Sequence, residues 1–149
     1  MAEKLFLEDL RVGQRFTSAP RRITADEIKA FAAHYDPQPF HLDDNGARGT
    51  LFGGLVASGW HTAAFTMRLI VESVPFASGI IGSGGELAWP LPTRPGDLLH
   101  TEVEVLAITP SRSRPERGMV EVRCVTINQN DEVVQTFTPK LVVARAPNG

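Results

Sequence analysis

Residues 36–70 read DPQPFHLDDNGARGTLFGGLVASGWHTAAFTMRLI, and the rest of the chain is organised around this stretch. Asp36 and His41 stand five positions apart in a segment with two prolines, which restrict the backbone. A turn that carries several glycines follows, and from about residue 59 the pattern becomes that of a long apolar helix. An acid and an imidazole ahead of the amino end of a buried helix predict a site for a small molecule.

The segment 59–73 is predicted to be a helix at the centre of the fold. Its apolar residues cover nearly the whole circumference, which is typical of a helix that is buried on all sides. Strand patterns follow at 80–91, 99–108, 119–128 and 133–145. A sheet wrapped around one helix is the economical packing of these elements, so we expect an α+β fold with an antiparallel sheet.

A strand at 15–23 and a shorter helix are predicted to precede the motif. Thr24 and Glu27 have the spacing of a capping box, which marks the start of this helix. Pro37 ends it, because the residue before a proline is disfavoured in the α region. Asp36 is that residue, so it is expected to leave the helix with little conformational freedom.

Two further segments carry signals in their glycines and prolines. The connection 36–54 is long for a structureless loop, and such loops are usually functional or disordered; its prolines favour an ordered one. In the predicted sheet, Gly82, Gly84 and Gly85 indicate a bend or a bulge, and Pro139 indicates a bulge or an edge position.

Composition limits the class of protein. The 149 residues are expected to form one domain over 1–149, with 42% hydrophobic and 21% charged residues, as in globular proteins. A net charge of −2 without a basic block argues against a nucleic-acid partner. The amino terminus lacks the apolar core of a signal peptide, and no apolar run is long enough to span a bilayer, so we expect a cytoplasmic protein without a membrane partner.

No metal site is expected. The chain has one cysteine, Cys124, which excludes an internal disulfide and a site built on several thiolates. The histidines and acids show no spacing typical of metal ligands. His61 lies on the predicted buried helix and is expected to be a packed, hydrogen-bonded residue rather than a catalyst.

The central motif and the layout resemble the MaoC-like family of hotdog-fold enoyl-CoA hydratases and dehydratases. The family pattern is roughly D-x-N-P-x-H, an extended loop, and H-G at the start of the central helix. Here DPQPFH stands at 36–41 and SGW at 58–60. The segments ELAWPLP at 86–92 and RPGD at 94–97 are similar to the family's second strand and its turn. The resemblance covers about residues 5–145.

The resemblance implies an activity and a mechanism. Water would be added to a 2-enoyl-CoA, or removed from a 3-hydroxyacyl-CoA of (R) configuration. Asp36 and His41 would activate the water as base and acid, and the backbone N–H of Gly59 would stabilise the negative charge on the thioester oxygen. Coenzyme A would be part of the substrate, and no metal or bound redox cofactor is expected.

The resemblance also implies an assembly. We expect a homodimer in which two sheets join edge to edge, or a higher oligomer of such dimers, with the acyl-CoA tunnel near the interface between the two chains.

Several positions are predicted to shape substrate binding. Gln38 replaces the usual asparagine and Ser58 the usual histidine, which bears on water geometry and substrate choice. Trp60 is predicted to narrow the acyl pocket in favour of a short or polar acyl group. The loop 111–118 is predicted to contact the phosphates of coenzyme A, because guanidinium groups suit phosphate. Its arginines are Arg112, Arg114 and Arg117.

Alternatives remain at this stage. Asp36 and His41 would fit a braced turn, and the arginine loop would fit a solvated hairpin. A hotdog acyl-CoA thioesterase has the same fold with a different reaction, because fold alone does not decide function. A non-catalytic acyl-CoA-binding subunit is the third alternative, and it rests on the departures at Gln38 and Ser58.

Overall fold

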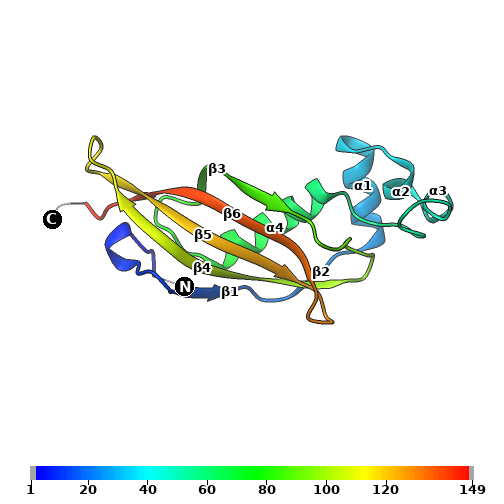
Figure 1. Ribbon diagram of the computed structural model, residues 1–149, viewed down its shortest axis with the longest axis horizontal. Coiled ribbons are helices and arrows are strands. Elements are labelled where there is room, and N and C mark those ends of the chain that lie inside the picture. The colour runs from blue at the N-terminus through cyan, green and yellow to red at the C-terminus, as the bar shows by residue number, and fades with distance from the viewer. Residues whose placement is uncertain (1–2, 148–149) are drawn as a thin grey trace.

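The computed structural model describes residues 3–147 and has the α+β architecture expected from the sequence. An antiparallel sheet lies along one long helix, with the strands in the order β1-β4-β5-β6-β3 and with β2 paired to β4 (Figure 1). The strands are β1 (Arg15–Thr17), β2 (Arg21–Arg22), β3 (Ile81–Ala88), β4 (Leu98–Pro110), β5 (Arg117–Ile127) and β6 (Val133–Ala144). The helices are the short 3-10 turn η1 (Leu7–Asp9), α1 (Ala25–Tyr35), α2 (Pro39–Leu42), α3 (Asp44–Ala47) and α4 (Gly59–Ser73).

The two ends of the molecule differ in what they contain. Helices α1, α2 and α3 gather at one end, beside the start of α4 (Figure 1). The turn between β4 and β5 lies at the other end, together with the last described residues of the chain (Figure 1). The site predicted around Asp36 therefore lies far from the predicted arginine loop within one chain.

Helix α4 has the predicted bounds, but only part of its circumference is buried. Ser58 caps it, because its hydroxyl accepts a hydrogen bond from the N–H of Trp60 at 3.2 Å. The side that faces the sheet carries Phe65, Leu69 and Ile70, all buried. Trp60 and Val71 are 62% and 58% exposed. The prediction of a helix buried all round was therefore wrong for the side turned away from the sheet.

The structure corrects two predicted connections. The strand expected at 15–23 is split into β1 and β2, since residues 18–20 form no ladder with β4, the strand that both pair with. The connection 36–54 is not a loop throughout, because it contains the single-turn helices α2 and α3. The capping box of α1 is confirmed: the Thr24 hydroxyl accepts from the Glu27 N–H at 3.2 Å, and the Glu27 carboxylate accepts from the Thr24 N–H at 3.1 Å.

The four long strands form as predicted, and none of their ends shifts by more than three residues. The bulge expected from the glycines of β3 is present, as a shift in register between Gly82 and Gly84. Pro139 does not lie at an edge: β6 is flanked by β5 and β3, and Pro139 pairs with Gly85. A Cβ on Gly85 would come within 2.7 Å of the Pro139 Cα, so only glycine allows these two backbones to approach so closely.

The buried interior has two apolar clusters with a polar row between them. The first cluster packs Ile70 and Val74 of α4 against Val103 and neighbouring strand residues. The second packs Phe65 and Leu69 against residues such as Ile23, Ile28 and Val134. Between them, buried threonines bond to one another, with Thr66 Oγ1 2.8 Å from Thr126 Oγ1 and the latter 3.0 Å from Thr101 Oγ1. No helix in the described part of the chain has the length and apolar character needed to cross a membrane.

Candidate functional site

Asp36 stands where α1 ends. Its N–H still donates to the carbonyl of Ala32 at 2.9 Å, but its own φ of −154° and ψ of 66° lie outside the α region, as expected before Pro37. The chain turns there and enters α2, which begins at Pro39. One turn of helix then brings His41 back toward the carboxylate of Asp36.

The ring of His41 is fixed by one hydrogen bond. Its Nδ1 lies 2.7 Å from the carbonyl oxygen of Val56, and because a carbonyl only accepts, Nδ1 carries the proton of that bond. The neutral ring therefore has its lone pair on Nε2. Nε2 lies 3.4 Å from Asp36 Oδ2, and the histidine is only 5% exposed.

The two positions that depart from the family pattern both bind Asp36. The hydroxyl of Ser58 donates to Oδ2 at 2.7 Å, and the side-chain amide of Gln38 donates to Oδ1 at 2.5 Å. The pKa of Asp36 is lowered, chiefly by the hydrogen bond from Ser58 and further by Gln38 and the charge of His41, while desolvation opposes the shift. The carboxylate is thus ionised and oriented at neutral pH, and the replacements do not disable it.

Gly59 is the first residue of α4, next to Ser58. Within residues 3–147 its N–H donates no hydrogen bond to the protein, as is usual for the first turn of a helix. Such groups, with the positive end of the helix dipole, favour negative charge. The residue is also constrained by packing, because a Cβ here would lie 2.7 Å from the indole ring of Trp89.

A hollow of about 380 Å³ opens beside these groups. His41, Gly59 and Trp89 line it, with apolar residues from the connection after α3 and two threonines. The other lining residues are Leu51, Phe52, Ala57, Thr62, Pro90, Leu91, Pro92 and Thr93.

The tryptophan that faces this hollow is Trp89 rather than Trp60. Trp60 does not line it, and its ring packs edge-to-face with that of Trp89, with the ring centroids 5.4 Å apart. Sequence reasoning passed over Trp89 as a site residue. A signal was available, since Trp89 stands in the segment ELAWPLP and is followed by a proline that restricts it.

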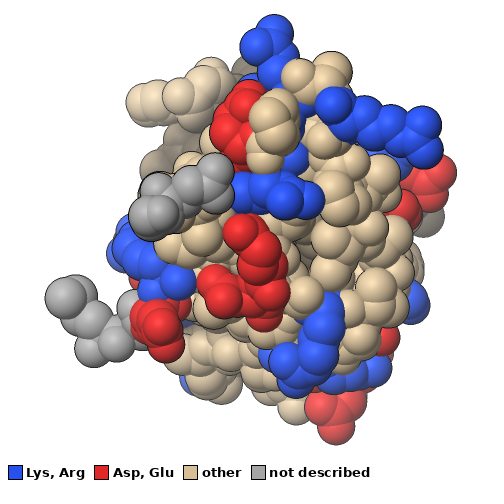
Figure 2. All heavy atoms as spheres, turned by 90° about the vertical axis from the view of Figure 1, so that its left-hand side faces the viewer, with Lys and Arg blue, Asp and Glu red and all other residues tan. Residues whose placement is uncertain are grey.

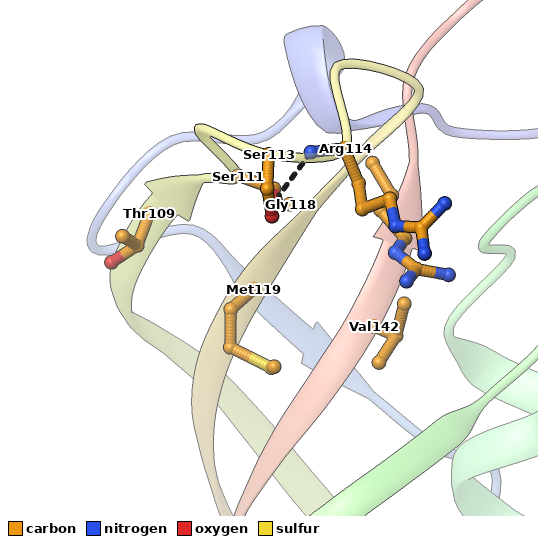
Figure 3. Close-up of a pocket in the computed structure, with 8 residues that line it drawn as sticks. Thr109, Ser111, Ser113, Arg114, Gly118, Met119 and Val142 are labelled. Carbon is orange, nitrogen blue, oxygen red and sulfur yellow. Dashed lines mark hydrogen bonds between the residues drawn. The ribbon is translucent and has the colours of Figure 1, made fainter.

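The arginine loop forms the turn between β4 and β5. Arg114 and Arg117 line a second hollow, of about 410 Å³, together with Ser111, Met119 and Val142. Figure 3 shows Arg114 beside Val142, and the Arg114 N–H donates to Ser111 Oγ at 3.1 Å. In the part of the chain that the structure describes, none of the three arginines of the loop takes part in a salt bridge.

The end of the molecule that carries this hairpin has a mixed charge. Figure 2 looks at that end, and groups of basic side chains stand there beside acidic ones. Glu8, Glu116 and Arg145 line a neighbouring hollow, so the basic groups do not form a continuous positive surface. The structure thus brings Asp36, Gln38, His41, Ser58 and Gly59 together and leaves the arginines apart.

The arrangement can hold and activate one water molecule. The carboxylate oxygen of Asp36 and Nε2 of His41 are 3.4 Å apart, so one small polar molecule can hydrogen-bond to both. A free backbone N–H stands next to them. Across residues 3–147, no group of three His, Cys, Asp or Glu side chains is placed to hold a metal ion.

Comparison with known proteins identifies the family. A crystal structure of a MaoC-like dehydratase from Rhodospirillum rubrum is 63% identical, with a TM-score of 0.94 over 97% of this chain and 99% of that one. An uncharacterised protein, YdeM of Bacillus subtilis, is 33% identical over 92% of this chain and 96% of its own length. A 3-hydroxybutyryl-CoA dehydratase of Methylorubrum extorquens is 30% identical over 87% of this chain and 78% of its own length.

Residues 9–129 match the family described as MaoC like domain, and the fold is the hotdog fold of its members. An acid, an imidazole and a helix amino end at the expected positions thus accompany a match over most of the chain, which belongs to the MaoC-like dehydratase family.

Proposed function

We propose that this protein is a hydratase or dehydratase that interconverts a 2-enoyl-CoA and a 3-hydroxyacyl-CoA thioester. The observation that carries the proposal is the pair formed by His41 Nε2 and Asp36 Oδ2, 3.4 Å apart, next to the free N–H of Gly59. The relative from Methylorubrum extorquens, named as a dehydratase of 3-hydroxybutyryl-CoA, supports the thioester as substrate.

In the hydration direction, the water would contact both Asp36 and His41 from the hollow beside them. Its oxygen forms a bond to C3 of the enoyl group while Nε2 of His41 takes one of its protons. The other hydrogen stays on the oxygen and donates a hydrogen bond to Asp36, whose carboxylate also stabilises the imidazolium that forms. The electron pair of the C2–C3 double bond moves toward the thioester oxygen, where the N–H of Gly59 meets the developing charge. The imidazolium then gives its proton to C2, which completes the addition of one water.

The hydrogen bonds around the pair support this division of roles. Asp36 is held as a carboxylate by Ser58 and Gln38, so it is better suited to orienting water than to taking its proton. Histidine is the side chain that exchanges protons near neutral pH. The bond from Nδ1 to Val56 leaves Nε2 free to do so.

We propose that a second chain helps to bind the coenzyme A part of the substrate. Strand β3 is an edge of the sheet, and nearly all of its residues are exposed. If two copies pair β3 with β3 in antiparallel fashion, the site end of each copy lies beside the hairpin end of the other. The arginine loop of one chain would then be near the acyl-CoA bound by its partner, which is how we propose that Arg112, Arg114 and Arg117 bind phosphate.

The experiment is a panel of enoyl-CoA and 3-hydroxyacyl-CoA thioesters, assayed together for hydration, dehydration and hydrolysis. We expect loss of enoyl absorbance without release of free thiol. Thiol release without hydration would show a thioesterase instead. Binding of acyl-CoA without any turnover across the panel would show a binding subunit, and either result overturns the proposal.

A further inference from the structure

We propose that Trp89, held in place by Gln135, is the wall that ends the acyl pocket and restricts it to short acyl groups. The inference rests on the proposed function, because it takes the hollow beside Gly59 to be the place where the acyl group of a thioester lies. It assigns chain-length selection to Trp89, and it assigns to Gln135 the role of a positioning residue that acts through the indole.

The first observation is where the indole ring lies. Trp89 directly follows the end of β3, and its ring faces the Cα of Gly59 so closely that a Cβ there would meet three ring carbons at 2.7–2.8 Å. The N–H of Gly59 is the group expected to face the thioester oxygen. An acyl chain that continues past that oxygen therefore soon meets the ring of Trp89, which lines the same hollow.

The second observation is what fixes the ring. The indole Nε1–H donates to Oε1 of Gln135 at 2.9 Å. Gln135 lies in β6 and is 1% exposed, among the largest fully buried side chains of the protein. The backbone of Trp89 is restricted as well, because Pro90 follows it.

The third observation is that the side-chain amide of Gln135 leaves its hydrogen-bond donor without a partner. Its Nε2 is buried and has no hydrogen-bond partner within residues 3–147. Burying an amide with an unmet donor is unfavourable, and if the indole turned away, Oε1 would lose its partner too. The indole therefore resists displacement by a longer acyl chain, which makes the wall rigid rather than adaptable.

The size of the hollow agrees with a short chain. Besides Trp89 and several apolar residues, the buried threonines Thr62 and Thr93 line it, with their hydroxyls 3.1 Å apart. A hollow of about 380 Å³ must also hold the thioester end of the coenzyme arm.

The test measures binding of saturated thioesters, which have no double bond to hydrate. Dissociation constants of butanoyl-CoA and octanoyl-CoA are measured by calorimetry for the wild type and for Trp89→Ala, with Trp89→Leu as a second variant in case the first does not fold. We expect the wild type to prefer butanoyl-CoA. Each variant should bind octanoyl-CoA at least about tenfold more tightly than the wild type does, since a buried methylene contributes roughly fourfold in affinity.

Two conservative variants isolate the role of Gln135. Trp89→Phe keeps a ring but removes the N–H, and Gln135→Met keeps the length of the side chain but removes the acceptor. Both should change the ratio of the dissociation constants of octanoyl-CoA and butanoyl-CoA in the same direction as Trp89→Ala, by a smaller amount. The double variant should move it no further than the larger single change, because both remove one hydrogen bond. Trp60→Ala should leave the ratio as it is, whereas a pocket narrowed by Trp60 would respond to it.

The outcomes separate this inference from the proposed reaction. Hydration by the wild type with an unchanged binding ratio in folded Trp89 variants would overturn the wall and leave the reaction standing. A shifted ratio without any hydration would support the wall and overturn the reaction. Equal binding of both thioesters by the wild type, or binding of neither, would overturn the wall.

Discussion

The two ends of this molecule carry different kinds of polar side chain. The end formed by α1, α2 and the start of α4 has a paired carboxylate and imidazole and a free backbone N–H. The hairpin end has Arg112, Arg114 and Arg117, none of which forms a salt bridge within residues 3–147. We propose that the first end performs proton transfer and that the second binds phosphate.

If the arginines bind the nucleotide of the proposed substrate, this separation means that one chain alone does not hold the whole substrate. The exposed edge strand β3 offers a way to bring opposite ends of two copies together, because antiparallel pairing of identical strands reverses one chain relative to the other. This account makes the two ends separable by mutation. Changes at the site end should act on the chemical step, and changes at the hairpin end should act on binding of the nucleotide.

The largest effect is expected at the site end. Asp36→Asn and His41→Ala should each lower kcat by at least about 100-fold, which is a typical contribution of a positioned acid or base. The double variant should be scarcely slower than the more damaged single variant, because residues that act on one water as a unit are not additive. The measurement is hydratase kcat for the three variants.

Melting temperatures provide the control for this prediction. Asp36→Asn keeps the shape of the side chain and its capacity to accept from Ser58, so the fold should be retained. Near-normal turnover in Asp36→Asn would remove the catalytic assignment. Loss of activity together with a large fall in melting temperature would show that the pair mainly braces the turn.

A smaller effect is expected at the hairpin end. Replacing Arg112, Arg114 and Arg117 by alanine should raise KM for an acyl-CoA by roughly tenfold and leave kcat within about threefold, because phosphate contacts stabilise ground and transition states alike. The matched control is the same acyl group on pantetheine, which lacks the nucleotide. Its KM should hardly change, and an equal loss with both substrates would contradict a phosphate role.

Sequence reasoning located α4, the four long strands and the acid–imidazole pair because each has a strong local cause. Helix α4 begins at a serine cap and ends before Pro75, and Asp36 leaves α1 because Pro37 follows it. Each of these features is determined by residues adjacent in the chain, so it can be predicted from the sequence alone.

Other features depend on contacts between distant segments. The acceptor for His41 Nδ1 is fifteen residues away, and Ser58 reaches Asp36 across twenty-two. Trp60 is next to Gly59 in the chain, yet the ring that packs on Gly59 is that of Trp89, whose N–H is bound by Gln135 of a later strand. The single turns α2 and α3 have too few residues for a periodic pattern to reveal them.

The two ends also differ in how their cores respond to acid, and this gives the smallest expected effect. The cluster toward the hairpin contains Cys124, whose pKa burial raises to about 12, so that thiol stays neutral across the range in which histidines titrate. The cluster toward the site is bordered by His61, which stacks on Phe31 with the rings 4.6 Å apart. His61 is packed as predicted, but its Nδ1 is buried without a hydrogen-bond partner in the described chain.

Burial lowers the pKa of His61, and the negative charge of Glu27 opposes this only in part. The folded protein therefore favours the neutral ring, while the unfolded chain takes up a proton below the ordinary value of 6.5. Unfolding then binds protons, so the free energy of unfolding should fall as the pH drops below about 6.5, by up to about 1.4 kcal/mol per pH unit.

In His61→Phe this part of the slope should be absent, with stability at pH 8 changed by less than about 1 kcal/mol, because a phenyl ring can take the same stacked place. Urea unfolding at pH 8 and at pH 5.5 measures it, and His34→Phe, a change at an exposed histidine of α1, is the control that should keep the wild-type slope. A wild-type slope in His61→Phe would mean that the acid sensitivity of the site end arises elsewhere.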